Sequence, residues 1–122
     1  MSYVLIVDDD KMVAEAIADL VDLYDWHAKI VHGPRAAFDQ IHRDPPALVL
    51  LDLNMPGVDG FEVMSYIRRD PIAEKTPIVF VTAEDDQGTR DKAKEAGALD
   101  YLIKPVDPEQ IEAILNKIKS PQ

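Results

Sequence analysis

The segment LVLLDLNMPG, residues 48–57, decides the fold class and raises the question of function. Four apolar residues run directly into Asp52, and Met55-Pro56-Gly57 then turns the chain. A short apolar run that ends at a turn is typical of a strand buried on both faces of a sheet. Asp52 alone would be an ordinary turn residue. Its significance therefore depends on which other side chains reach the same place.

Similar apolar runs recur along the chain and alternate with helical patterns. Apolar residues at helical spacing predict a helix after each run, and Pro45 and Pro71 follow the expected ends of two of them. Asp107 is the predicted N-cap of the last helix, with Pro108 at its first position. The strands are predicted at residues 3–7, 27–31, 47–51, 78–82 and 99–103, and the helices at residues 13–24, 36–41, 61–67, 86–96 and 108–118.

Five strand–helix units predict an α/β fold with one parallel sheet covered on both faces. Right-handed crossovers restrict the topology, and five units are too few for an eight-stranded barrel. An open, doubly wound sheet is therefore expected. The length of 122 residues fits one domain that spans residues 1–122.

Composition limits the classes of partner. The chain has 13 basic and 23 acidic side chains, so its net charge is 13 − 23 = −10. This charge argues against direct contact with nucleic acid or an anionic membrane and is compatible with a cation or a basic partner protein. The absence of cysteine excludes disulfides and thiolate metal sites. No signal peptide and no spanning apolar run is present, and we expect a cytoplasmic location.

Polar side chains follow four of the five predicted strands, and the second strand contributes no comparable group. The carboxyl ends of parallel strands meet at one edge, which is where ligands bind. Carboxylates about 4–5 Å apart repel by roughly 3–4 kcal/mol, so they must take up protons or bind a cation. Oxygen ligands favour Mg²⁺, with Mn²⁺ or Ca²⁺ as alternatives. The residues concerned are Asp8, Asp9, Asp10, Asp52, Thr82 and Lys104.

A cation, a lysine and a hydroxyl beside a carboxylate suit phosphoryl transfer, and the carboxylate can itself be the acceptor. Each residue alone also has an ordinary structural interpretation. Asp9 or Asp10 could cap the first helix, Thr82 could simply end a strand, and Lys104 could be a solvated lysine. Residues 86–96 have almost no large apolar side chain, which indicates either a weakly held, movable helix or merely a solvent-rich one.

Four motifs together resemble the CheY-like receiver domain of bacterial two-component response regulators. They are VDDD (residues 7–10), LLDLNMPGVDG (residues 50–60), VTA (residues 81–83) and YLIKP (residues 101–105). The resemblance covers essentially the whole chain. It implies a flavodoxin-like sheet with strand order 2-1-3-4-5 and five helices.

The resemblance also implies roles for individual residues. Asp52 matches the phosphoacceptor. Asp8 and Asp9 match the acidic pair that holds Mg²⁺, Asp9 directly and Asp8 through water. Asn54 matches the position whose backbone carbonyl binds the metal. The positions that match phosphoryl-binding residues are Lys104, Thr82 and Ala83. The switch residues are Thr82 and Tyr101, and Tyr101 would turn inward when Thr82 moves to the phosphoryl group. The Lys104–Pro105 peptide bond is expected to be cis.

The implied function is that of a phosphoacceptor domain in a phosphorelay, not of a classical enzyme. A histidine kinase or histidine phosphotransfer protein would phosphorylate Asp52, and the domain would catalyse its own Mg²⁺-dependent phosphorylation and dephosphorylation. Phosphorylation would switch the surface formed by residues 86–96, 99–103 and 108–118. This surface would bind an effector protein, a fused output domain or a second copy of the chain.

Three alternatives remain at this point. A haloacid-dehalogenase-type phosphatase would need a second acid at position 54, where the chain has Asn54, and a flavin phosphate would be repelled by residues 8–10. The chain could also be a receiver from a larger regulator: Met1 indicates a natural start, but Gln122 lies where a linker to an output domain would begin. Glu84 is a further candidate for tuning phosphoryl lifetime, which dephosphorylation of Glu84→Ala would test.

Overall fold

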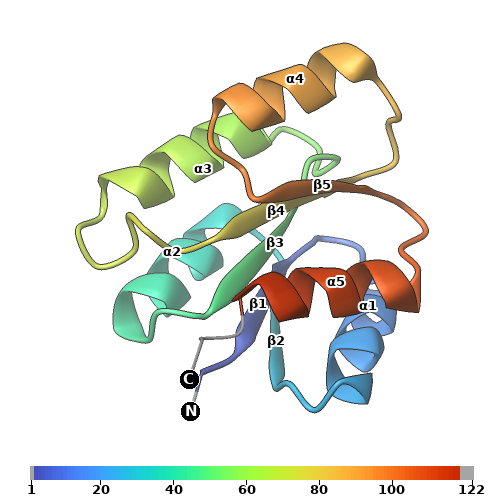
Figure 1. Ribbon diagram of the computed structural model, residues 1–122. Coiled ribbons are helices and arrows are strands. Elements are labelled where there is room, and N and C mark those ends of the chain that lie inside the picture. Colours follow the sequence, from blue (N-terminus) through green and yellow to red (C-terminus); the bar gives the residue numbers. More distant parts are fainter. Residues whose placement is uncertain (1, 119–122) are drawn as a thin grey trace.

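The structure is a computed structural model that describes residues 2–118. Strands and helices alternate along the whole described chain (Figure 1). The strands are β1 (Val4–Val7), β2 (Ala28–Val31), β3 (Leu48–Asp52), β4 (Ile78–Thr82) and β5 (Asp100–Ile103), and the helices are α1 (Lys11–Leu23), α2 (Pro34–Arg43), α3 (Gly60–Arg69), α4 (Gln87–Glu95) and α5 (Pro108–Ile118).

The five strands form one parallel sheet in the order β2-β1-β3-β4-β5. This order confirms the expected doubly wound fold. The direction in which successive strands are added to the sheet reverses at β1, because β2 lies on one side of β1 and all later strands lie on the other. At such a switch point the loops after the two strands diverge and leave a crevice at the carboxyl edge. The loops after β1 and β3 are those that carry the predicted acidic residues.

The helices cover both faces of the sheet (Figure 1). Helices α2, α3 and α4 pack on one face, with Leu51 and Phe80 among the strand residues beneath them. Helices α1 and α5 pack on the other face, over residues such as Leu50 and Val81. Neighbouring residues of a strand therefore belong to opposite cores, which explains why β3 and β4 are buried at every position.

Helix boundaries differ from the sequence-based expectation by one or two residues at most ends. Helix α1 begins at Lys11, two residues earlier than predicted, because its exposed first turn carries no apolar signal. Asp10 is its N-cap: the carboxylate accepts hydrogen bonds from the N–H groups of Met12 and Val13. Asp52 is the last residue of β3 and does not follow the strand. Helix α5 begins at Pro108, as predicted.

Helix α4 is weakly anchored to the rest of the protein. It buries only Ala93, whereas α5 buries Ile111, Ile114 and Leu115. Few buried apolar contacts are typical of elements that open at low free energy. No helix within residues 2–118 has the length and apolar character needed to cross a bilayer.

Candidate functional site

Three carboxylates converge at the carboxyl edge of the sheet. One oxygen from each of Asp8, Asp9 and Asp52 lies within 4.8 Å of the others. Asp8 and Asp52 are buried, with 1% and 2% of their surface exposed, whereas Asp9 is exposed. Asp8 follows β1 and Asp52 ends β3, so the two neighbouring central strands bring them together. The cluster therefore has a buried side and an open side.

Asp8 is held in place but only partly satisfied. Its Oδ1 accepts a hydrogen bond of 2.9 Å from the Asp10 N–H. Its Oδ2 is buried and accepts no hydrogen bond from the described residues, although the Lys104 ammonium lies 3.2 Å away. Burial raises the pKa of Asp8, the Asp10 hydrogen bond opposes this, and the charge of Asp52 raises the pKa further. The site thus disfavours a bare carboxylate at this position.

Lys104 bridges the two buried acids. Its Nζ donates a 3.0 Å hydrogen bond to Asp52 Oδ1, and its side chain is 17% exposed. Burial acts to lower the pKa of Lys104, but the hydrogen bond to Asp52 and the charges of Asp52 and Asp8 outweigh it and raise the pKa. The Lys104 side chain is therefore protonated and positively charged at neutral pH. The peptide bond to Pro105, which follows it, is cis.

Thr82 and Ala83, at the end of β4, contact the side chain of Asn54. The Thr82 hydroxyl donates to Asn54 Oδ1 at 3.0 Å, and the Ala83 N–H donates to the same oxygen at 2.7 Å. The Asn54 N–H in turn donates to Asp52 Oδ1 at 2.9 Å. Asn54 thus connects the loop after β3 with the loop after β4.

Tyr101 lies next to this group on β5. The Glu84 N–H donates to Thr82 Oγ1 at 3.1 Å, and the Tyr101 hydroxyl donates to the Glu84 carbonyl at 2.9 Å. Tyr101 is only 8% exposed, and the Arg90 guanidinium of α4 lies 5.1 Å from its ring centroid. The resemblance implied an inward turn upon recruitment of Thr82, so any such movement must begin from a ring that is already buried.

The donor set suits a hard divalent cation. It consists of carboxylate oxygens, with none of the cysteine or histidine ligands that zinc prefers. The Asp8 oxygen without a hydrogen bond is a buried acceptor that a cation, or a water bound to it, would satisfy. The residues present therefore fit Mg²⁺, which Asp9 and Asp52 would hold with support from Asp8.

Two features of the site were missed from the sequence. His32, the residue directly after β2, has its ring Nδ1 2.9 Å from the Asp8 carbonyl oxygen. His32 contacts the backbone of Asp8 and not the carboxylates, and the strand-end rule places it at the carboxyl edge without predicting this contact. The Asn54 side chain was also missed, because only its backbone carbonyl had been given a role. No local pattern indicates that its amide reaches the end of β4.

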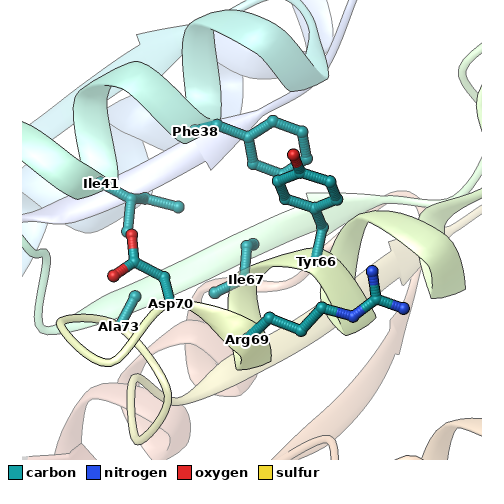
Figure 2. Close-up of a pocket in the computed structure, with 7 residues that line it drawn as sticks. All are labelled: Phe38, Ile41, Tyr66, Ile67, Arg69, Asp70 and Ala73. Carbon is teal, nitrogen blue, oxygen red and sulfur yellow. The ribbon is translucent and has the colours of Figure 1, made fainter.

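A cavity elsewhere lacks a cluster of carboxylates. Its volume is about 280 Å³, and it lies between α2 and α3 (Figure 2). The rings of Phe38 and Tyr66 stack at its edge, with centroids 4.6 Å apart. None of the predicted site residues lines it, so we assign the function to the acidic cluster. The lining residues are Phe38, Ile41, Tyr66, Ile67, Arg69, Asp70 and Ala73.

Comparisons with known proteins agree with this architecture. Residues 4–116 match the response regulator receiver domain family. The response regulator Rre1 of Synechocystis sp. is 34% identical over 97% of the chain, and the histidine-protein kinase BarA of Escherichia coli is 30% identical over 95%. The crystal structure of chemotaxis protein CheY4 from Vibrio cholerae matches with a TM-score of 0.88 and 25% identity, covering 98% of this chain and 99% of CheY4.

The relatives place this type of domain in different contexts. The chain spans 52% of the length of Rre1 and 13% of the length of BarA, but nearly all of CheY4. Similarity therefore concerns the domain and not the remainder of the longer proteins. The family match covers most of the chain and includes every strand and all of the site described above. The chain belongs to the response regulator receiver domain family.

Proposed function

We propose that this chain is a phosphoacceptor signalling domain in which Asp52 is phosphorylated in a Mg²⁺-dependent reaction. The observation that carries the proposal is the arrangement around Lys104, whose ammonium lies 3.0 Å from Asp52 and 3.2 Å from Asp8. A lysine between two buried carboxylates, beside a third, neutralises only part of their charge. A bound divalent cation would offset the remaining negative charge and leave the site able to accept a phosphoryl group.

The two oxygens of Asp52 have different surroundings. Oδ1 accepts hydrogen bonds from Lys104 and from the Asn54 N–H. No described residue donates to Oδ2, which leaves this oxygen to attack the phosphorus of a phosphohistidine. The O–P bond forms as the P–N bond breaks, and the electron pair of the P–N bond returns to the imidazole. Mg²⁺ held by Asp9 and Asp52 would supply charge neutralisation for the phosphoryl oxygens.

Phosphorylation would act on the donors around the site. The phosphoryl group adds about −1.5 to −2 charges and strong acceptor oxygens, to which we assign Lys104, Thr82 and Ala83 as donors. Thr82 is linked to Tyr101 through the backbone of Glu84. A shift of Thr82 would therefore reach Tyr101 and the weakly anchored α4. We propose that α4, β5 and α5 form the surface that responds.

The partners follow from this chemistry. The donor would be a histidine kinase or a histidine phosphotransfer protein, in a cytoplasmic phosphorelay. The downstream partner would be a separate effector protein, an output domain in the same polypeptide, or a second copy of the chain. The relatives that are only half matched or less support the possibility of an attached domain.

Intact mass spectrometry after incubation with acetyl phosphate and Mg²⁺ tests the proposal. We expect the wild type to gain the mass of one phosphoryl group, and Asp52→Asn or addition of EDTA to abolish the gain. Asp59→Asn is the matched control, because Asp59 is an exposed N-cap of α3 whose capping role Asn preserves. A gain that persists in Asp52→Asn, or a folded wild type that is never modified by acetyl phosphate or by any histidine kinase, would refute the proposed acceptor.

A further inference from the structure

The Asn54 amide oxygen occupies a position that two donors share. It accepts from the Thr82 hydroxyl at 3.0 Å and from the Ala83 N–H at 2.7 Å. A backbone N–H can only donate, so the atom that faces Ala83 must be the oxygen of the amide and not its nitrogen. These two donors are the ones that the proposed function assigns to a phosphoryl oxygen. Asn54 is exposed, so its side chain has room to leave.

We infer that the Asn54 side chain is a positioning residue that substitutes for the phosphoryl oxygen before phosphorylation and must be displaced by it. This inference rests on the proposed function of Asp52. The competition is direct, because one acceptor position is available between Thr82 Oγ1 and the Ala83 nitrogen. Asn54 therefore lowers the affinity of the site for a phosphoryl group while keeping both donors in place.

The same oxygen stands at the start of a chain of hydrogen bonds. Thr82 donates to Asn54 and accepts from the Glu84 N–H, and the Glu84 carbonyl accepts from Tyr101. When a phosphoryl oxygen displaces the Asn54 side chain, the acceptor of the Thr82 hydroxyl changes at one end of this series of hydrogen bonds. Asn54 sets the reference position from which Thr82 and Tyr101 move.

Asn54→Ala tests this role, because it removes the amide and retains the Asn54 N–H that donates to Asp52. The first readout is hydrogen exchange of the Ala83 amide, followed by NMR in the unphosphorylated protein, and we expect faster exchange in the variant. The second is titration with beryllium fluoride, a phosphoryl mimic, at saturating Mg²⁺. Loss of two competing hydrogen bonds should tighten its binding by roughly 5–30-fold.

Thr82→Val provides the matched background. Valine keeps the shape of threonine and removes the hydroxyl, so only the Ala83 N–H remains to hold Asn54. In this background Asn54→Ala should tighten binding by a smaller factor than it does in the wild type, which a double-mutant cycle quantifies. An equal factor in both backgrounds would contradict the Thr82 contact.

The outcomes separate this inference from the proposed function. Unchanged exchange of Ala83 in Asn54→Ala, or unchanged or weaker binding of beryllium fluoride, would overturn the inference while the proposed function stands. A wild type that binds no beryllium fluoride would instead refute the proposed phosphoryl site, and with it the competition at Thr82 and Ala83. Faster exchange together with tighter binding would establish the role of Asn54.

Discussion

Replacing Asp8 with Asn should stabilise the metal-free protein and remove its response to Mg²⁺. Asp8 Oδ2 is buried, and the Lys104 ammonium at 3.2 Å satisfies it only in part, so it retains some of the roughly 1–3 kcal/mol cost of an unsatisfied buried acceptor, to which the repulsion from Asp52 adds. Asparagine retains the oxygen that accepts from Asp10 and places an uncharged amide nitrogen where Oδ2 was, near Lys104 and the neighbouring carboxylates. Lys104 keeps its hydrogen bond to Asp52, so loss of its contact with Asp8 costs about 1 kcal/mol. We therefore expect a net stabilisation of about 1–2 kcal/mol.

Thermal unfolding followed by circular dichroism measures this change. In EDTA at pH 7, Asp8→Asn should melt about 4–8 °C above the wild type. With Mg²⁺ at ten times its dissociation constant, the wild type should gain about 1.4 kcal/mol, whereas the variant should gain little. The difference in melting temperature between Asp8→Asn and the wild type should therefore become smaller, or change sign, when Mg²⁺ is added.

The pH dependence provides an independent check. The folded-state pKa of Asp8 lies above its unfolded value, so ionisation of Asp8 opposes folding fully above the folded pKa, and this effect disappears as the pH falls through it. The advantage of Asp8→Asn in EDTA should therefore shrink as the solution is acidified.

Asp10→Asn is the matched control for Asp8→Asn, because it removes the same charge two residues away and keeps an N-cap side chain. Its stability should change by less than about 0.5 kcal/mol. A variant Asp8→Asn that is less stable than the wild type in EDTA would refute the reasoning, since the Lys104 contact would then outweigh burial.

Three other substitutions test separate parts of the structure. Lys104→Met should lower the free energy of unfolding in EDTA by about 3–5 kcal/mol. Because the pKa of Lys104 is raised in the folded protein, the difference from wild type should be complete below the ordinary lysine pKa and be lost as the pH rises through the raised pKa. Equal stability at pH 7 would contradict the bridge. Tyr101→Ala should leave phosphorylation of Asp52 intact and reduce the changes in amide NMR chemical shift that phosphorylation causes in α4. Tyr101→Phe should lose only the hydrogen bond from the hydroxyl to Glu84, which stabilises the protein by about 1 kcal/mol. Undiminished chemical-shift changes in Tyr101→Ala would contradict its switch role. Gly57→Ala should destabilise the protein by about 1–2 kcal/mol in urea unfolding, because Gly57 has φ +73° and nothing else lies within reach of an added methyl group; no loss would mean that the turn relaxes.

The order of elements and the carboxyl edge could be predicted because both depend on local sequence. Fully apolar runs such as residues 48–51 indicate strands buried on both faces, and the right-handed crossover rule then restricts the topology. That every parallel strand ends at one edge is a consequence of this topology. Asp8, Asp52 and Lys104 could therefore be grouped before any coordinates were considered.

Helix starts were less predictable, for a physical reason. The first turns of α1 and α2 are exposed, and exposed turns carry no apolar periodicity. Their positions depend on capping, and two adjacent aspartates, Asp9 and Asp10, offered equal caps in the sequence. Only the folded backbone decides that Asp10 caps the helix while Asp9 faces the other carboxylates.

The sequence by itself determined the fold class, the acidic edge and the family of this protein. Tertiary structure alone decided which oxygen of Asp8 lacks a hydrogen bond, that His32 approaches Asp8, and that the Asn54 amide binds Thr82 and Ala83. These contacts join residues 24 to 29 positions apart through the ends of neighbouring strands. Their geometry depends on distances of a few tenths of an ångström, which no residue pattern encodes.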